Sequence, residues 1–453
     1  MMFAQFNTST VNQTGSGNGS AVSQTGNNNG STVDQVGDTN GSDVLQNGST
    51  NFNDVDQLGN GNGSDVDQIG DNNSAQVHQG FGAGVSENDG NNAQISQTGN
   101  SNSGHIDQYG DAGGSDNNTA WIQTTGDSNF SYENQVGDGN TAQNLQQSNS
   151  NSSTINQIGD GNYGGAGQGY FLGDSNVSTI DQIGNSNYAI TFQLGEDNES
   201  DVDQGGDQHS STVTQTGNLH NSTVDQDGFS NESIVDQAGI GFTGNTSTVI
   251  QNGIDNYSEV NQDNFLLGNI STVTQTGDDN ESYVDQAIAA NGSSVIQNGD
   301  ENYSDVDQDG TANNSTVNQQ GNLNDSDVDQ TGNNNSSGVA QIGNENESIV
   351  FQDGTLNNSS VWQNGDFNQS DVYQDGNSNF SDVKQDGDSN MSDVDQLQSG
   401  NTSGVIQTGT FHSSIVFQNG NGNTSAVNQN GNNHSSTVNQ IGNGNSSTVT
   451  QSN

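Results

Sequence analysis

Carboxylates are the side chains best placed to do chemistry in this chain. Aspartate and glutamate total 55 against a single lysine or arginine, which gives a formal net charge of -54. Many segments read Asp-Val-Asp-Gln, and aspartates recur at a step of 22 residues in two series. If the chain stacks at that step, each series becomes a column of carboxylates about 4.8 Å apart. Ca²⁺ prefers oxygen ligands and could bridge such columns, whereas diffuse counterions on a solubilising face are the alternative. The candidate cation-bridged columns contain Asp181, Asp203, Asp225, Asp285, Asp307 and Asp329.

Histidine could add metal or acid–base chemistry, but the spacing of the six histidines favours a structural role. Four of them lie five residues after a glutamine, where most repeats have asparagine, and we interpret them as rings that replace an amide: His209, His220, His412 and His434. His78 and His105 fall at positions expected to face solvent. No catalytic triad, phosphate-binding loop or dinucleotide motif stands out. The sequence therefore predicts a protein that is not an enzyme and needs no cofactor, with Ca²⁺ as the one candidate ligand.

The acidity and the composition restrict the class of protein. Nucleic-acid binding requires a basic footprint, and anionic membrane surfaces attract basic segments, so neither is expected as a partner. No apolar run approaches the length of a membrane span, so membrane insertion is not expected. With 25% hydrophobic residues and 62 glycines, composition alone is typical of disordered chains. The chain has no proline, however, which suits a chain whose segments all join a hydrogen-bonded ladder.

An eleven-residue repeat, N-x-S-x-V-x-Q-x-G-x-x, organises the chain. Its glutamines recur every eleven residues from Gln13 to Gln79 and again from Gln275 to Gln451. Asn, Ser, Val and Gln alternate with other residues, and this period of two predicts a β-strand with the four side chains on one face. The glycine after each glutamine predicts a tight turn. Each repeat is therefore one strand and one turn.

One such strand cannot bury a core alone, but stacked repeats can. Stacking places like residues over like residues, and the amides of Asn and Gln can then satisfy one another along the axis. The sequence predicts an all-β protein: a β-solenoid of stacked 22-residue strand-turn-strand rungs, each of two eleven-residue units, with an amyloid-like two-sheet core. The expected core ladder is exemplified by Asn18, Ser20, Val22, Gln24, Asn29, Ser31, Val33, Gln35, Asn346, Ser348, Val350, Gln352, Asn357, Ser359, Val361 and Gln363.

The repeat is expected to form one solenoid domain over residues 1–453. The spacing of the glutamines expands at several places, with Gln123 taken as the glutamine of its unit. Loop length costs little, so insertions are best accommodated in turns. Enlarged turns are expected near 80–91, 111–118, 169–175, 238–244 and 263–268.

The pattern resembles the curlin repeat, whose signature reads S-x5-Q-x-G-x-x-N-x-A-x3-Q. The stretch from Gln24 to Gln35 matches it with Ser31 in the alanine position, and Ala75 and Ala142 place alanine there. The resemblance implies a structural subunit of curli-like functional amyloid fibres, a secreted, extracellular component of the cell-surface biofilm matrix that serves adhesion. It also implies self-association into fibres, a nucleator subunit and an outer-membrane secretion pore as partners. Residues 1–5 show no export signal, which we expect to have been removed.

Two alternatives remain open at this stage. The first is a monomeric, calcium-stabilised solenoid adhesin. The second is an ice-binding solenoid, because threonines in Ser-Thr-Val segments could form flat outward arrays. At the 22-residue step, however, Thr437 falls over Ile415 and Thr448 over Ala426, so no regular threonine face is expected.

Overall fold

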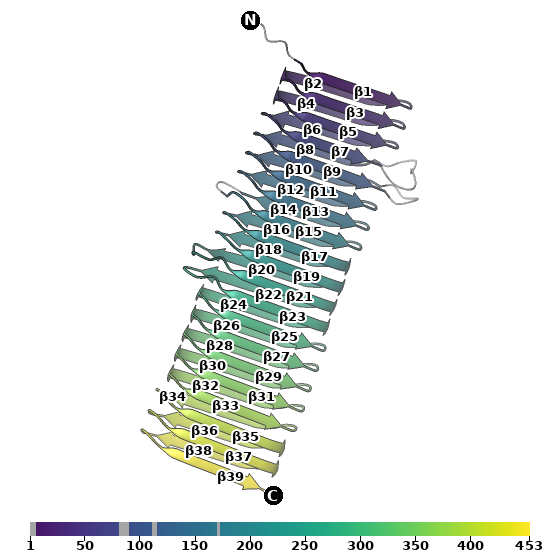
Figure 1. Ribbon diagram of the computed structural model, residues 1–453. Coiled ribbons are helices and arrows are strands. Elements are labelled where there is room, and N and C mark those ends of the chain that lie inside the picture. Colours follow the sequence, from purple (N-terminus) through teal and green to yellow (C-terminus); the bar gives the residue numbers. More distant parts are fainter. Residues whose placement is uncertain (1–5, 81–89, 111–115, 170–172) are drawn as a thin grey trace. The chain divides into compact units, whose positions relative to one another are not determined.

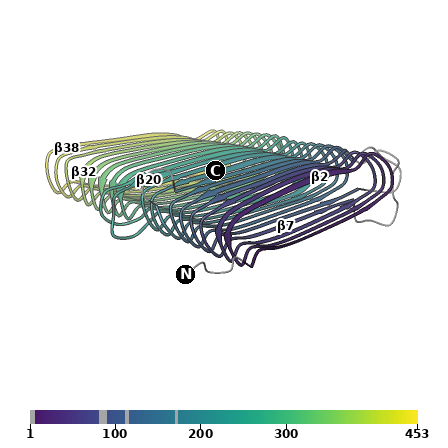
Figure 2. The same cartoon turned by 90° about the horizontal axis from the view of Figure 1, so that it is seen from above.

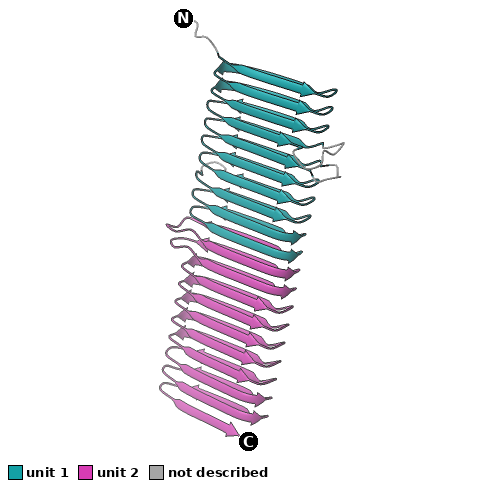
Figure 3. Ribbon diagram, turned by 45° about the vertical axis from the view of Figure 1, so that its right-hand side comes forward, with its two compact units in different colours: residues 1–230 teal, residues 231–453 magenta. Residues whose placement is uncertain are grey.

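A computed structural model describes residues 6–80, 90–110, 116–169 and 173–453. In these residues the chain forms 39 β-strands and no helix, so no helix capable of crossing a membrane is found there. Within each compact unit of the chain, the strands run across a stack and the turns lie at its two edges (Figure 1). The chain divides into two compact units, residues Met1–Ser230 and Asn231–Asn453, coloured separately in Figure 3.

In unit 1, the odd-numbered strands form one sheet and the even-numbered strands form the other. The strands of the first sheet are β1 (Thr8–Thr14), β3 (Gly30–Val36), β5 (Phe52–Leu58), β7 (Ser74–Gln79), β9 (Ser103–Tyr109), β11 (Phe130–Val136), β13 (Ser152–Ile158), β15 (Val177–Ile183), β17 (Glu199–Asp207) and β19 (Asn221–Phe229). Those of the second are β2 (Gly19–Asn27), β4 (Gly41–Ser49), β6 (Gly63–Ile69), β8 (Asn92–Thr98), β10 (Thr119–Thr125), β12 (Thr141–Gln147), β14 (Tyr163–Gln168), β16 (Tyr188–Leu194) and β18 (Ser210–Thr216). Figure 2 shows β2 and β7 in opposite layers.

Unit 2 repeats this arrangement. Its even-numbered strands are β20 (Glu232–Gly239), β22 (Tyr257–Asn264), β24 (Glu281–Ala289), β26 (Tyr303–Thr311), β28 (Asp325–Asn333), β30 (Glu347–Thr355), β32 (Gln369–Asn377), β34 (Met391–Leu397), β36 (Ser413–Asn419) and β38 (Ser435–Ile441). Its odd-numbered strands are β21 (Thr246–Ile254), β23 (Ile270–Asp278), β25 (Gly292–Asn298), β27 (Asn314–Gln320), β29 (Ser336–Ile342), β31 (Asn358–Asn364), β33 (Phe380–Asp386), β35 (Thr402–Thr410), β37 (Thr424–Asn432) and β39 (Ser446–Ser452).

Within each sheet the strands pair in parallel and in register at the spacing of the double repeat. Val328 of β28, for example, pairs with Val306 of β26 and with Val350 of β30. The inward side chains are buried and the outward ones are partly or fully exposed, so the burial pattern alternates along nearly every strand. The prediction of an all-β solenoid with two sheets and 22-residue rungs is confirmed.

Glycine suits the turns because the backbones of neighbouring rungs lie close together there. Gly354 has a φ of +118°, and a Cβ atom there would lie 2.0 Å from the carbonyl oxygen of Gly376 in the next rung. Two residues later Leu356 adopts a φ of +61°. At Gly354 the stacked turns therefore approach too closely for a side chain, whereas Ser148, Ile288 and Gln398 occupy the same position of their repeats with a φ near +80°.

The enlarged turns expected from the sequence lie only partly within the description. Residues 81–89, 111–115 and 170–172 fall outside the described residues, so three of the five expected turns are not described in full. In unit 2, residues 240–245 connect β20 to β21, and residues 265–269 connect β22 to β23. These two turns carry exposed apolar side chains, among them Phe242 and Phe265.

Candidate functional site

Columns of amide side chains in the core form hydrogen bonds from rung to rung. Gln308 Nε2 donates to Gln330 Oε1 at 2.8 Å and to the carbonyl oxygen of Gly292, on the opposite sheet, at 3.0 Å. Asparagine uses its side chain differently: Asn313 Oδ1 accepts the backbone N–H of Asn335 at 3.0 Å. Buried polar groups normally need such partners, and the stacking supplies them to these amides, whereas core serine hydroxyls such as that of Ser348 have none.

The predicted core residues lie on this inward face. Those of β30, β31 and the turns before them are at most 2% exposed: Asn346, Ser348, Val350, Gln352, Asn357, Ser359, Val361 and Gln363. Asn29, Ser31, Val33 and Gln35 are also buried. Asn18, Ser20, Val22 and Gln24 belong to β2 and the turn before it, and they are only half-buried because β2 pairs with β4 alone among the described strands.

The sequence interpretation of the core was wrong at one eleven-residue repeat of unit 1. Thr124, not Gln123, occupies the inward glutamine position of β10, because Ile122 and Thr124 pair with Asn144 and Gln146 of β12. Gln123 faces outward, opposite Leu145. The insertion before β10 shifts the repeat by one residue, and the pattern Ala-Trp-Ile-Gln-Thr would have revealed this if valine rather than glutamine had set the register.

An acid in the core was also missed. Glu133 takes the valine position of β11 and is fully buried. Burial raises its pKa to about 8, so its carboxyl group is neutral at pH 7. The signal was present in the sequence, because Phe-Ser-Tyr-Glu-Asn-Gln places glutamate where other repeats have valine.

The structure places the six candidate aspartates in two outward columns. We call the outward residue immediately before each core glutamine the pre-glutamine position. Asp203 pairs with Asp181 and Asp225 in unit 1, and Asp307 pairs with Asp285 and Asp329 in unit 2. Partial desolvation and then the neighbouring carboxylates raise the pKa of Asp203 above its usual range. The same two causes raise the pKa of Asp307 to about 6.

The column in unit 2 borders a shallow acidic cavity of about 360 Å³. Its lining includes Glu259, Tyr283, Asp285, Tyr303 and Asp307. The tyrosine rings stand side by side on neighbouring rungs, with the centroids of Tyr283 and Tyr303 5.9 Å apart. Carboxylates gathered at one rung spacing repel one another, and a cation between them would remove that repulsion.

The histidines divide between core and surface. His209, His220 and His412 are buried in the asparagine column, and His434 is half-buried near the end of unit 2. The Nε2 of His220 bonds the carbonyl oxygen of Thr216 at 3.2 Å, as an asparagine amide does elsewhere. Burial lowers the pKa of His220, which keeps the ring neutral.

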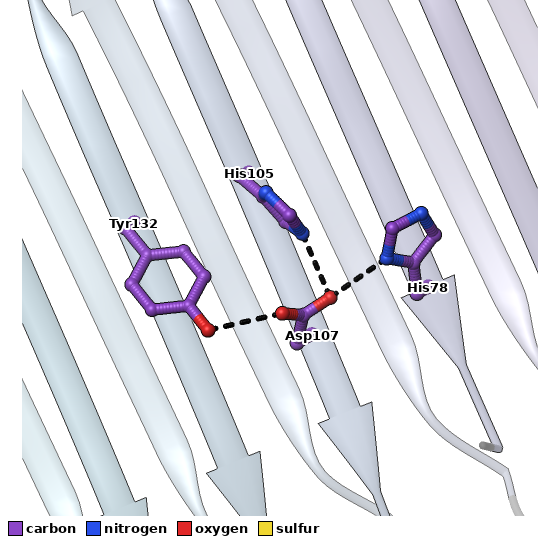
Figure 4. A network of polar contacts seen from close by, with 4 residues as sticks. All are labelled: His78, His105, Asp107 and Tyr132. Atoms are coloured by element: carbon purple, nitrogen blue, oxygen red, sulfur yellow. Dashed lines mark hydrogen bonds and ion pairs between the residues drawn. The ribbon is translucent and has the colours of Figure 1, made fainter.

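His78 and His105 were expected to be solvated, and the structure contradicts this. His78 Nδ1 and His105 Nε2 both lie 2.8 Å from Oδ1 of Asp107. The hydroxyl of Tyr132 donates to the other oxygen, Oδ2, at 3.0 Å (Figure 4). Sequence analysis missed this network because His78 and His105 are 27 residues apart, across an insertion that breaks the 22-residue step.

The network changes the ionisation of its members. Burial raises the pKa of Asp107, but the hydrogen bonds from His105, His78 and Tyr132 outweigh burial and hold that pKa well below its usual range. The hydrogen bond that His78 donates to Asp107 raises the pKa of His78. The network therefore favours an ionised Asp107 and protonation of His78.

The end strands differ from the interior strands in burial and in charge. β1 pairs only with β3 and β39 only with β37 among the described residues. Val11 in the core position of β1 is 44% exposed, whereas Val33 one rung inward is 0% exposed. No charged residue precedes Asp34 and none follows Asp395. Among the described residues, each end strand therefore lacks a strand partner on one side and carries no charge.

Comparison with known proteins agrees with the repeat. A family model of the curlin associated repeat matches residues 184–217, 299–332, 368–397 and 426–452. The matched segments fall in both units. No curated protein matches the chain.

Proposed function

We propose that this chain, a curlin-repeat protein, is the structural subunit of an extracellular curli-like amyloid fibre, of the kind that serves biofilm matrix and adhesion. The observation that carries the proposal is the pair of open strand edges. Natural sheet proteins usually blunt an exposed edge with charge, proline or a covering segment. The end strands of this chain carry no charge and no proline, although the sequence between them is strongly acidic.

The direction of the core ladders supports a defined polarity for the fibre. In the bonds between core glutamines, Nε2 of one rung donates to Oε1 of the next rung toward the C-terminus. Gln13 of β1 donates to Gln35, and Gln429 donates to Gln451 of β39. Among the described residues, Gln13 Oε1 has no ladder donor and Gln451 Nε2 has no ladder acceptor. A second copy placed head to tail would supply both, in the same parallel register that the chain uses internally.

The charge distribution supports the same joint. Carboxylates at one strand spacing repel, and this repulsion is confined to the interior rungs. A head-to-tail contact between β39 and β1 places Val449 over Val11 without bringing two charged columns together. Heterologous contacts of this kind generate open filaments rather than closed rings. The family resemblance adds secretion, a nucleator subunit and an outer-membrane pore to the proposal.

The experiment blocks one edge at a time. Val11→Asp places a charge on the core face of β1, and Val449→Asp does so on β39, while Thr10→Asp and Thr448→Asp place the same charge on the outward face as matched controls. Fibre growth is followed by thioflavin fluorescence, electron microscopy and fibre diffraction, where a reflection near 4.8 Å is expected. We expect growth from the wild type and both controls and none from either blocked variant.

Mixing the two blocked variants tests the polarity. A Val11→Asp copy keeps a free β39 edge, and a Val449→Asp copy keeps a free β1 edge, so the mixture is expected to give heterodimers and no fibres. If each variant dimerises alone, edges pair with themselves and the head-to-tail joint is wrong. If the wild type stays monomeric over a range of pH and salt, the fibre function is wrong and a monomeric adhesin takes its place.

A further inference from the structure

We propose that His78, His105 and Asp107 form a binding site for a divalent transition-metal ion of the zinc and copper class. The three side chains project from the outer face of neighbouring strands β7 and β9 in unit 1 (Figure 4). Each residue offers one donor atom, and the three donor atoms lie within 4.8 Å of one another. The site is separate from the core columns that the fibre function uses.

The distances suit a small ion. Each imidazole nitrogen is 2.8 Å from Oδ1 of Asp107. A tetrahedral ion with ligands at about 2.0–2.1 Å holds its donors roughly 3.3 Å apart. Each imidazole nitrogen therefore needs to move only about half an ångström farther from Asp107 Oδ1.

The register of the sheet holds the ligands in place. Asp107 pairs directly with His78, and His105 stands beside it on β9, two residues earlier. The ring of His105 makes edge contacts with His78 and with Tyr132, both at centroid distances of 5.1 Å. Asp107 is only 7% exposed although its position faces outward. Ligands fixed in this way lose little freedom when an ion binds.

Outer groups complete the environment. The Tyr132 hydroxyl donates to Oδ2 of Asp107 at 3.0 Å and so orients Oδ1 toward the histidines, as hydrogen-bond donors around a metal site do for the carboxylates that bind the ion. Asp54 and Asp56 lie on β5, next to His78 on the side away from Asp107. Their oxygens come within 4.8 Å of the His78 ring nitrogen. This negative surround favours a dication.

The donor set determines the class of ion. Two imidazole nitrogens and one carboxylate suit Zn²⁺, Cu²⁺ or Ni²⁺, whereas Ca²⁺ takes six to eight oxygens. The all-carboxylate columns around Asp203 and Asp307 contain no nitrogen donor in the pre-glutamine position. The two kinds of column therefore differ in the metal that they can select.

Such an ion would join β7 to β9, whose ligands His78 and Asp107 are 29 residues apart in the chain. Binding to the folded state alone stabilises it, by an amount that grows with the logarithm of metal concentration. We expect the ion to stabilise the rungs of unit 1 near β7 and β9 and to leave unit 2 unchanged.

The test measures Zn²⁺ binding to the full chain by equilibrium dialysis with elemental analysis, and Co²⁺ binding by its visible absorption. His78→Gln and His105→Gln each remove one ligand, while His220→Asn restores the repeat residue in the core and serves as the matched control. Circular dichroism checks that each variant keeps its strands. We expect one tightly held ion per chain, at least a tenfold weaker affinity in either ligand variant, and no change in the control.

A background of calcium separates this site from the acidic columns. With millimolar Ca²⁺ present, Zn²⁺ held by histidine should remain bound, whereas ions on carboxylate columns should exchange. The proposal is overturned if no ion binds in that background, or if the ligand variants and the control bind Zn²⁺ equally well. Fibre formation is measured separately, so failure of this site leaves the proposed function untouched.

Discussion

At the pre-glutamine position, the pKa of an aspartate is shifted in opposite directions in two parts of the molecule. On β5, β7 and β9 it holds Asp56, His78 and Asp107, and the pKa of Asp107 falls well below its usual range because histidine hydrogen bonds outweigh burial. On β26 it holds Asp307 between two further aspartates, and partial desolvation with those charges raises the pKa of Asp307 to about 6. The backbone register is the same in both places.

The difference shows what the solenoid fixes and what it leaves free. Parallel in-register pairing brings every pre-glutamine residue within one strand spacing of its equivalents, whatever their charge. Residue identity then decides whether that closeness stabilises or destabilises the fold. At Asp107 the hydrogen bonds from two histidines and Tyr132 together reverse the direction of the pKa shift.

The largest expected effect tests whether both columns tolerate charged side chains because these side chains face outward. Val328 lies in the core between two outward aspartates of β28 and is 0% exposed. Val328→Asp would bury a carboxyl group without a partner, at a cost of about 3 kcal/mol or more. We expect a large fall in thermal stability and a sharp slowing of fibre elongation.

Thr316→Asp is the matched control for that variant. Thr316 is an exposed residue of β27, and its register partners are Ser294 and Gly338, neither of which is charged. A new aspartate there should change stability by no more than about 0.5 kcal/mol. Equal effects of the two substitutions would show that the assignment of faces, and with it the comparison, is wrong.

A reciprocal exchange tests whether histidine alone causes the difference. His78→Asp converts the first column to three aspartates, removes a hydrogen bond to Asp107 and adds a repulsion; we expect a loss of about 1–2 kcal/mol at pH 7. Asp307→His places an imidazole between Asp285 and Asp329, and we expect a gain of up to about 1 kcal/mol. Denaturant unfolding of both variants measures the two changes. Shifts in the same direction would mean that local packing, not charge, sets the stability of the columns.

Much of the fold could be predicted because the repeat is nearly free of exceptions. Alternation of Asn, Ser, Val and Gln fixed the inward face, and constant spacing fixed the register, so the pairing of Asp307 with Asp285 and Asp329 followed from arithmetic. Prediction failed where the spacing changed. The insertion before β8 hid the meeting of His78 with Asp107, and the insertion before β10 misplaced Gln123, because a one-residue slip reverses every face of a strand.

A smaller effect appears in the pH dependence of the two columns. The folded pKa of Asp307 lies above its unfolded value of 3.8, so its contribution is complete below about 3.8 and is lost as pH rises through about 6. For Asp107 the folded pKa lies below 3.8, so its contribution is present above that value and is lost as pH falls. Because Asp307 is exposed, solvent screening reduces its share to about 1 kcal/mol.

Hydrogen exchange of individual strands, corrected for the intrinsic pH dependence of exchange, can follow both columns at once. We expect protection of β26 to fall between pH 4 and 7 while that of β9 holds, and β9 to weaken only in stronger acid. Asp307→Asn should flatten the response of β26 and leave that of β9 as it is. A uniform response of both strands would contradict separate local titrations and indicate that the total charge dominates.

The smallest effect concerns a third column of pre-glutamine residues, which contains the one lysine of the chain. At the pre-glutamine positions of β31 and β33, Trp362 pairs with Lys384, whose Nζ lies 4.5 Å from the indole ring centroid. An exposed cation–π contact of this kind contributes about 0.5–1 kcal/mol. Lys384→Gln keeps a polar chain but removes the charge, so unfolding should become easier by about 0.5 kcal/mol, whereas Lys384→Arg should keep most of the contact. When Lys384→Gln is made in a Trp362→Leu background, where no ring remains, the loss of stability should be smaller. If Lys384→Gln costs the same with and without the ring, the lysine acts only through the net charge, and the comparison of columns reduces to counting acids.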